Sequence, residues 1–150
     1  MNLAEILPQE AVLPELEGQS LEAVLEELTD PLLVLHPEIA GFDVVKALCE
    51  RENMGSTAVG EGVAIPHGKV PGLRSIALAV GRSRDGVDFK APDKALCHIF
   101  YLILAPAEGG AGQHLRLLAQ IARRAKDPVF RSEVLLAESR AQLWQTLTAP

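Results

Sequence analysis

One histidine, His67, stands in a setting suited to covalent chemistry. It lies in Ile65-Pro66-His67-Gly68, between a residue with a fixed backbone φ and a residue without a side chain. Such a setting holds an imidazole rigidly and leaves space around it. A neutral imidazole, with a reference pKa of about 6.5, offers a nitrogen lone pair for attack on a phosphoryl group near neutral pH. A histidine that only completes a tight turn would explain the same residues.

Two further residues, His114 and Arg51, are suited to assist such chemistry. His114 lies at the expected start of a helix after a Gly-rich loop, where free N–H groups and the helix dipole favour an anion. An exposed helix residue is the alternative. Arg51 ends the helix expected before the glycine-rich segment, and a guanidinium binds phosphate oxygens bidentately. Alone, it reads as a solvated charge. We expect His36 to lie at the surface and His98 to be a hydrogen-bonded residue of a strand.

The residues around His67 resemble the active-site signature of a known family. The matching residues are Arg51-Glu52, Gly55-Ser56-Thr57 and GEGVAIPHG at 60–68. At this spacing they are similar to the enzyme IIA domains of the bacterial phosphotransferase system, in the fructose/mannitol class that includes the nitrogen-regulatory protein. The resemblance extends over nearly the whole chain and includes the helix that begins near His114.

This resemblance implies a role for three of the matched residues. His67 would be the phosphorylated residue, Arg51 would steady the phosphoryl group, and His114 would be the second active-site histidine. Ser56 and Thr57 match the small polar pair of the motif, and this pair either shapes the pocket or caps a turn. Three matched positions are thus left without an assigned role: Ser56, Thr57 and Glu61.

The function implied by the resemblance is that of a phosphohistidine carrier, a phosphotransferase component that releases no product of its own. The phosphocarrier protein HPr, or its nitrogen-branch counterpart, would donate the phosphoryl group to His67. The phosphorylation state would then change which regulatory target proteins are bound. Because the chain holds a single such domain, we expect a free-standing regulatory member of the nitrogen type. The alternative is a sugar-specific component that passes the group to a IIB domain during carbohydrate uptake.

Other classes of site find less support in the sequence. A small zinc metallohydrolase would use His67 and His114 with His98 or Cys97, but no HExxH or CxxC pair is present, and we expect no metal. No Walker-type Lys-Ser/Thr follows the glycines, so we expect neither a nucleotide site nor another cofactor. A non-catalytic interaction module with a degenerate site is disfavoured because Arg51, His67 and His114 are all present.

The bulk properties predict one domain over residues 1–150. The chain is 48% hydrophobic and has a formal net charge of −6, which argues against nucleic acid as a partner. No apolar run approaches the roughly 20 residues of a membrane span, and the first ten residues lack a basic leader. We therefore expect a soluble cytoplasmic protein without membrane insertion, in which Cys49 and Cys97 are reduced thiols. Nothing indicates an oligomeric state.

Hydrophobic periodicity predicts helices alternating with strands, which is typical of an α/β layer structure. The expected strands are a weak one at 12–13, two central ones at 75–81 and 96–104, and an edge strand at 87–89 after a turn at Asp85-Gly86. The resemblance implies a mixed, mostly parallel sheet of about five strands with helices on both faces, and a site at one end of the sheet.

Five helices are predicted in addition. The first has Ser20 as its N-cap and is ended or kinked by Pro31. The second covers 41–53, with Phe42, Val45, Leu48 and Cys49 inside and Lys46, Glu50 and Glu52 outside. The third covers 113–125, with Leu115, Leu118, Ala119 and Ala122 inside and Arg116, Arg123 and Arg124 in its polar set. Asp127-Pro128 begins the fourth, and a capping box of Ser139 and Gln142 begins the last.

Overall fold

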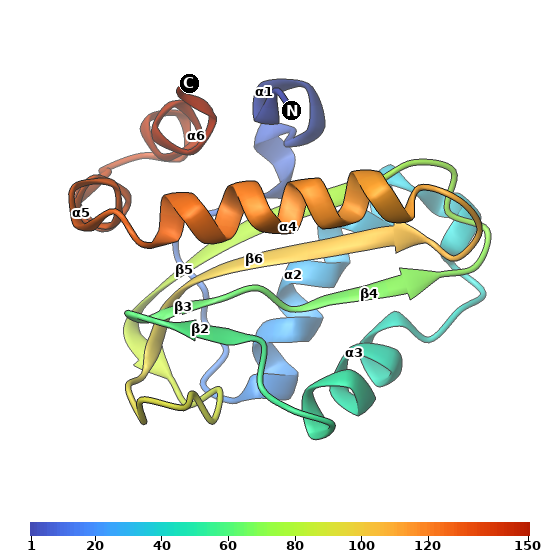
Figure 1. The fold of residues 1–150 in the computed structure, drawn as a ribbon, viewed down its shortest axis with the longest axis horizontal. Helices are drawn as coiled ribbons and strands as arrows, with labels where there is room; N and C mark the ends of the chain where they lie inside the picture. The colour runs from blue at the N-terminus through green and yellow to red at the C-terminus, as the bar shows by residue number, and fades with distance from the viewer.

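The computed structural model describes residues 1–150 as a mixed sheet covered by helices on both faces (Figure 1). The helices are α1 (Leu3–Ile6), α2 (Leu21–Leu35), α3 (Val44–Asn53), α4 (Ala111–Ala125), α5 (Pro128–Leu136) and α6 (Arg140–Thr148). The strands are β1 (Val12–Leu13), β2 (Ala58–Gly60), β3 (Val63–Ala64), β4 (His67–Val70), β5 (Ala77–Val87) and β6 (Cys97–Pro106). The predicted α/β class is confirmed.

The sheet is organised around β6. Its strand order is β1-β5-β6-β3-β2, and β4 also pairs with β6. Strand β5 runs antiparallel to β6, whereas β3 and β4 follow one another in parallel along its other edge, opposite Ile99 to Phe100 and Ile103 to Pro106. The six strands therefore occupy five positions across the sheet, close to the five expected. The junction between β3 and β4 is Ile65-Pro66, which brings His67 to the first position of β4.

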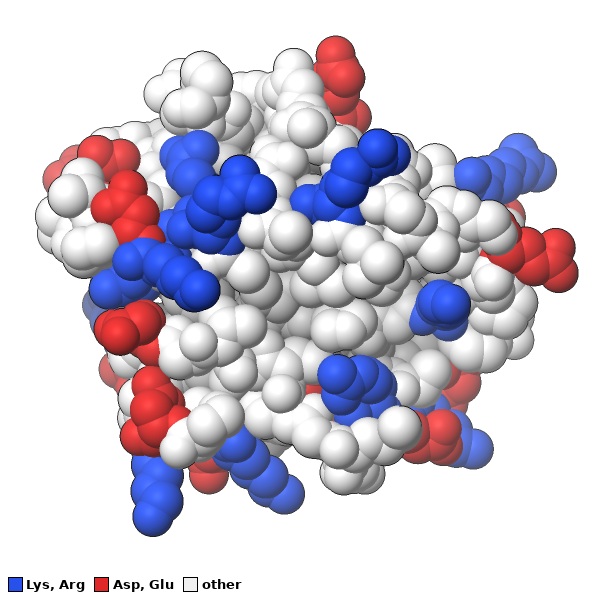
Figure 2. All heavy atoms as spheres, viewed as in Figure 1, with Lys and Arg blue, Asp and Glu red and all other residues white.

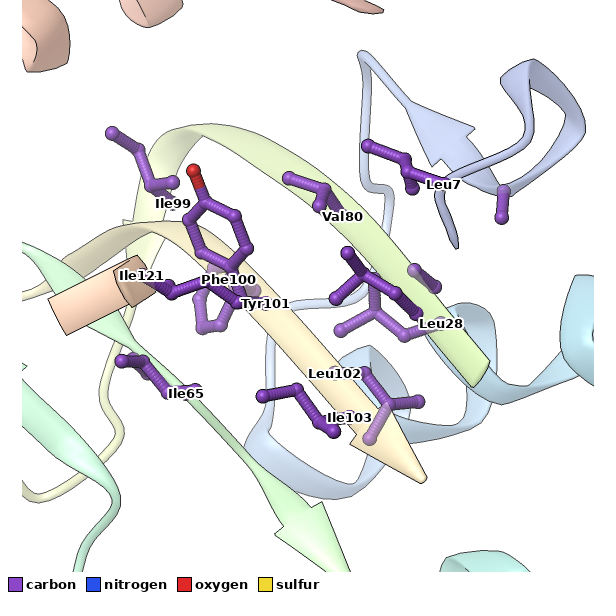
Figure 3. Close-up of a cluster of buried hydrophobic side chains, with 14 of the residues drawn as sticks. Leu7, Leu28, Ile65, Val80, Ile99, Phe100, Tyr101, Leu102, Ile103 and Ile121 are labelled. Atoms are coloured by element: carbon purple, nitrogen blue, oxygen red, sulfur yellow. The ribbon is translucent and has the colours of Figure 1, made fainter. Parts of the chain in front are cut away.

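The centre of the core is the apolar segment of β6. Residues 99–105 are all buried, as predicted for a strand covered on both faces. Figure 3 shows side chains of this strand, including Phe100, Tyr101 and Leu102, between residues of the flanking helices, including Leu28 of α2 and Ile121 of α4. Together 41 buried residues form one continuous cluster. The site therefore rests on a rigid support.

The helix starts follow the predicted capping residues. Ser20 accepts a hydrogen bond from the Ala23 N–H at 3.2 Å, Asp127 caps α5 and Ser139 caps α6. Pro31 does not end α2, which continues to Leu35. The surrounding buried leucines hold this helix against the sheet, and their burial offsets the hydrogen bond that Pro31 cannot donate. No helix in the structure is both long and apolar enough to cross a membrane.

Helix α3 begins later than predicted, and its inner face agrees with the predicted one in part. The Asp43 side chain accepts a hydrogen bond from the Lys46 N–H at 3.1 Å, which fixes the first turn at Val44 and not at residue 41. Its buried residues are Val44, Leu48 and Glu52, so Leu48 lies inside as predicted, and the predicted Phe42 and Cys49 are partly buried against the core. The expectation that Glu52 lies outside is wrong, because this carboxylate finds hydrogen-bond donors in the following loop.

The predicted turn at Asp85-Gly86 is also wrong. Strand β5 continues through both residues to Val87, so no separate edge strand exists at 87–89. Its register against β6 shifts between Arg82 and Val87. Gly86, with a φ of 83°, provides the backbone conformation of this irregularity, so the turn-type residues form a bulge within one long strand.

The inner face of α4 is displaced from the predicted one. The buried residues are His114, Leu117, Ile121 and Ala125. By contrast, Leu115 is 65% exposed, and the rest of the predicted inner stripe is at most half-buried. Both sets follow helical spacing and both contain apolar residues, so periodicity could not separate them. Leu115 and Ala119 are exposed, whereas Leu118 and Ala122 are partly buried and pack against the core, so the predicted inner face is correct in part. The set of Leu115, Leu118, Ala119 and Ala122 is here called the α4 apolar stripe.

Candidate functional site

The structure brings His67, His114 and Arg51 to one depression with a volume of about 490 Å³. Arg51 comes from the last turn of α3, His67 from the start of β4 and His114 from the first turn of α4. The nine residues that line the depression are Ala47, Arg51, His67, Gly68, Lys69, Ala111, His114, Leu115 and Leu118. Three segments far apart in the sequence thus contribute charged or titratable groups to one hollow.

The imidazole of His67 is half-buried and held in one orientation. Its Nδ1 lies 2.8 Å from the carbonyl oxygen of Ile65. Because a carbonyl oxygen only accepts, Nδ1 carries the proton and donates it, and Nε2 keeps the lone pair. The next residue is glycine, Gly68. A β-carbon at this position would lie 3.3 Å from Cδ2 of Leu48, so glycine lets β4 approach α3 closely. A second hollow of about 330 Å³ also borders the ring.

The ring of His114 packs beside that of His67. The ring centroids are 5.5 Å apart and the planes are inclined by 70°. His114 is only 8% exposed, so the alternative of an exposed helix residue does not hold, and its buried Nε2 has no hydrogen-bond partner. Burial lowers the pKa of His114, and the nearby His67 and Lys69 lower it further. The arrangement therefore offers a neutral imidazole with one unused polar atom.

Arg51 presents an uncompensated positive charge to the depression. Its Nη1 donates a hydrogen bond of 2.9 Å to the Gly55 carbonyl oxygen, which anchors the guanidinium while leaving its other N–H groups free of protein partners. The structure contains two ion pairs, His36 with Glu38 and Arg131 with Glu61. Neither involves Arg51, so an anion in the depression would be its only close counter-charge.

The three matched residues without an assigned role have hydrogen-bond or ion-pair partners of their own, and Ser56 and Thr57 also line the second hollow beside His67. Ser56 Oγ donates to the Phe89 carbonyl oxygen at 2.6 Å and accepts from the Ala58 N–H at 3.0 Å, which is a structural use. Thr57 donates to Glu52 through both its N–H and its hydroxyl. Glu61 lies in the turn between β2 and β3 and lines neither hollow.

Two residues near the site were missed from the sequence. Glu52 is buried, with 8% of its surface exposed. Its spacing of four from Leu48 and eight from Val44 is that of the inner face of a helix, and this spacing could have indicated its burial. The charge of the residue outweighed the spacing in the prediction. Lys69 lines the depression because it stands two residues after His67 in β4, and alternate residues of a strand share a face.

An apolar surface with a basic surround adjoins both hollows. The α4 apolar stripe lines them from one side, and α4 also carries three arginines and no acidic residue. Figure 2 shows this face with Lys and Arg side chains spread around a largely uncharged centre and acidic side chains mainly towards the edges. An exposed apolar patch of this kind is typical of a protein interaction site.

The histidines and cysteines do not assemble a metal site. No group of three or more His, Cys, Asp or Glu side chains is arranged to hold a metal ion. The Nδ1 of His98 donates to the Ser83 carbonyl oxygen at 3.0 Å, as expected for a hydrogen-bonded strand residue. Cys49 and Cys97 are free thiols, and burial raises the pKa of Cys97 to about 11. The zinc hypothesis therefore finds no ligand set in this geometry.

The chain is similar to known proteins over nearly its whole length. The chain is 36% identical to a nitrogen regulatory protein of Bradyrhizobium diazoefficiens, over 100% of this chain and 97% of the relative. It is 33% identical to the fructose-specific EIIA component of a phosphotransferase system in Haloferax volcanii, over 97% of this chain and 94% of the relative. The crystal structure of nitrogen regulatory protein IIA-Ntr from Neisseria meningitidis superposes with a TM-score of 0.87 at 32% identity, covering 97% of this chain and 99% of that one.

The family assignment rests on the match of nearly the whole sequence. The sequence model described as "Phosphoenolpyruvate-dependent sugar phosphotransferase system, EIIA 2" matches residues 5–149. The motif around His67 lies inside this range, and the relatives named above match over almost their full lengths. The chain therefore belongs to the EIIA 2 family of the phosphoenolpyruvate-dependent sugar phosphotransferase system.

Proposed function

We propose that the chain is a phosphohistidine carrier that accepts a phosphoryl group on Nε2 of His67 from an HPr-type protein. The observation that carries this proposal is the hydrogen bond from Nδ1 of His67 to the Ile65 carbonyl oxygen. It leaves the Nε2 lone pair free on a ring that borders two open hollows. A nucleophile in this state needs no base to activate it.

The transfer balances without proton removal from His67. The lone pair of Nε2 attacks phosphorus in line, and the bond between phosphorus and the donor's imidazole nitrogen breaks as the new N–P bond forms. The donor imidazole, protonated on its other nitrogen, leaves as a neutral ring with the electron pair of the broken bond, and the positive charge passes to the ring of phosphorylated His67. Nδ1 of His67 keeps its proton and its hydrogen bond to Ile65, so the ring is held in the same orientation before and after transfer. Onward transfer reverses these events.

His114 and Arg51 fit the task of stabilising the transferred group. A phosphoryl oxygen beside the His67 ring would give the unpartnered Nε2 of His114 an acceptor, provided that nitrogen carries the proton. An unsatisfied buried polar atom costs about 1–3 kcal/mol, and binding would relieve this cost. The uncompensated guanidinium of Arg51 supplies positive charge where negative charge is spread over the oxygens. Lys69 adds a mobile positive charge at the rim.

The surface around the site fits a partner with an apolar centre and an acidic rim. The net charge of −6 conceals a strong asymmetry, because residues 1–45 hold ten Asp or Glu and no Lys or Arg, whereas residues 46–150 hold 14 Lys or Arg and ten acids. The basic residues of α4 therefore stand out locally. Complementary charge accelerates encounter and sets orientation between partners. We place this relay in the cytoplasm, with an HPr-type protein as donor.

The direct test is phosphorylation in a reconstituted system. The chain is incubated with enzyme I, an HPr-type protein and phosphoenolpyruvate, and labelling is read by intact mass. We expect one acid-labile, base-stable phosphoryl group on wild type and none on His67→Ala. His36→Ala is the matched control, since His36 lies away from the hollows, and it should label as wild type does. Equal labelling of wild type and His67→Ala would overturn the proposal.

The regulatory role is favoured over sugar uptake by the nitrogen regulatory relatives, but a fructose-specific relative of similar length supports a second candidate. In that role phospho-His67 passes its group to a IIB domain. The two roles separate when phosphorylated chain is mixed with a purified fructose-type IIB domain. Rapid transfer of label to the IIB domain supports the sugar-specific role, and retention of label supports the regulatory role.

A further inference from the structure

A buried carboxylate, Glu52, lies directly behind the site and touches neither hollow. It is 8% exposed and accepts two hydrogen bonds from a single residue, Thr57. One comes from the Thr57 N–H at 3.0 Å and the other from the Thr57 hydroxyl. Burying a carboxylate is costly unless it is hydrogen-bonded or paired, so this arrangement needs a reason beyond the packing of α3.

A continuous series of hydrogen bonds connects this carboxylate to the imidazole of His67. Thr57, held by Glu52, accepts at its carbonyl oxygen a hydrogen bond of 3.0 Å from the Ile65 N–H. Ile65 in turn accepts, at its own carbonyl oxygen, the 2.8 Å hydrogen bond from Nδ1 of His67. Each contact fixes the position of the next, so the orientation of the ring depends on the position of Thr57.

The same carboxylate also borders the anchor of the guanidinium. Arg51 precedes Glu52 in the last turn of α3, and its Nη1 is held by the carbonyl oxygen of Gly55. The Gly55 N–H donates to the Glu52 carbonyl oxygen at 3.1 Å. Gly55, which anchors Arg51, thus lies in the loop between Glu52 and Thr57. The hydrogen bonds from Thr57 to Glu52 close this loop.

We infer that Glu52 is a positioning residue, which through Thr57 fixes both the tautomer and orientation of His67 and the placement of Arg51 for phosphoryl transfer. This inference rests on the proposed function. A carboxylate suits the position because it is an acceptor at both oxygens and Thr57 presents two donors. Glutamine has one acceptor oxygen and an amide donor, so it can satisfy only one of the two Thr57 donors in the same way.

The test compares Thr57→Val, Thr57→Ser and Glu52→Gln. Thr57→Val removes only the hydroxyl hydrogen bond and keeps the shape of the side chain, whereas Thr57→Ser keeps the hydroxyl. Thr29→Val is the matched control, because Thr29 is also buried and its hydroxyl donates to the Leu25 carbonyl oxygen at 2.7 Å within α2, away from both hollows. Thermal unfolding checks that every variant is folded under the assay conditions.

The first readout is the tautomer of His67 in unphosphorylated protein, measured by ¹⁵N NMR of the ring nitrogens. We expect wild type, Thr57→Ser and Thr29→Val to show a protonated Nδ1 and a bare Nε2. Thr57→Val and Glu52→Gln should show a mixture of tautomers. This readout uses no phosphoryl donor, so it stands even if the chain proves not to be a phosphocarrier. An unchanged tautomer in both variants would overturn the inference.

The second readout separates kcat from KM for phosphorylation by the HPr-type donor. Displacing a reacting group by about 1 Å can cost as much as 100-fold in rate, and we expect kcat to fall roughly tenfold in Thr57→Val. KM for the donor should stay within about twofold of wild type, because Glu52 lines neither hollow and Thr57, which lines the second hollow, keeps the shape of its side chain in Thr57→Val. Thr57→Ser should restore kcat. A rise in KM alone, or no rescue by serine, would contradict a positioning role.

Discussion

The rings of His67 and His114 meet edge to face, with centroids 5.5 Å apart and planes inclined by 70°. Burial lowers the pKa of His114, and the nearby His67 and Lys69 lower it further. His114 is therefore held neutral beside the ring of His67. A dianionic phosphoryl group on His67 would reverse the electrostatic influence on His114 and favour its protonation.

The lowered pKa of His114 predicts a loss of stability in mild acid. The unfolded chain takes up this proton near its ordinary pKa of 6.5, whereas the folded protein takes it up only at lower pH. The stabilisation is therefore complete above pH 6.5 and is lost as the pH falls towards the folded pKa. Urea unfolding at about pH 7.5 and pH 5.5 should show a smaller loss for His114→Gln than for wild type. An equal loss in both would contradict this account.

Replacement of Arg51 should slow phosphorylation of His67 more than it weakens donor binding. A lysine cannot both anchor on the Gly55 carbonyl oxygen and reach a phosphoryl oxygen, because it lacks the planar fork of a guanidinium. Removing one charge-stabilising group typically costs about 100-fold to 1,000-fold in kcat. We expect Arg51→Lys to lose about 100-fold, measured by single-turnover transfer. The control Arg84→Lys, at an exposed arginine of β5 outside the depression, should match wild type.

Two neighbouring leucines of α4 should respond in opposite ways. Leu117 is fully buried and Leu115 is 65% exposed. Leu117→Ala should lower the free energy of unfolding by about 2–5 kcal/mol because it leaves a cavity, whereas Leu115→Ala should change it by less than about 0.5 kcal/mol. In transfer kinetics, Leu115→Ala should raise KM for the donor. Chemical denaturation with matched kinetics checks both, and an unchanged KM would remove Leu115 from the docking surface.

Arg82 should contribute strongly to stability although it lies outside the site. Its half-buried guanidinium donates to the carbonyl oxygens of Pro14, Val134 and Ala137 at 3.0, 2.8 and 2.7 Å, which joins β5 to the end of α5 and the N-terminal segment. Arg82→Ala leaves these acceptors unsatisfied and should cost about 2–4 kcal/mol in urea unfolding. The neighbouring Arg84→Ala should change little. A similar loss of unfolding free energy in Arg82→Ala and Arg84→Ala would show that the positive charge, and not the hydrogen bonds of Arg82, stabilises the fold.

Much of the fold follows from local signals that the structure confirms. The capping residues Ser20, Asp127 and Ser139 each accept a hydrogen bond from the first turn of their helix. The apolar run at 96–104 forms the central strand β6. These features depend on neighbours in the sequence, so propensity and spacing suffice. Likewise, the motif around His67 indicated which residues share one depression.

The rest depended on contacts between segments distant in sequence. Glu52 is buried because Thr57, beyond the end of its helix, supplies two donors, and no periodicity encodes those donors. Leu115 is exposed because His114 and Leu117 face the sheet in its place. Asp85 and Gly86 form a bulge because the long partner β6 continues past them. In each case tertiary structure decided between two locally acceptable arrangements.

The junction of β3 and β4 fixes His67 to the central strand of the sheet. Pro66 accepts a hydrogen bond from the Ile103 N–H at 3.0 Å, and β4 then continues in register along β6. The ring of His67 is thus mounted on the central sheet, where a large displacement would break the hydrogen bonds between β4 and β6. If His67 carries a phosphoryl group as proposed, the two states differ in charge and not in backbone shape, and we expect a partner protein to distinguish them by electrostatics.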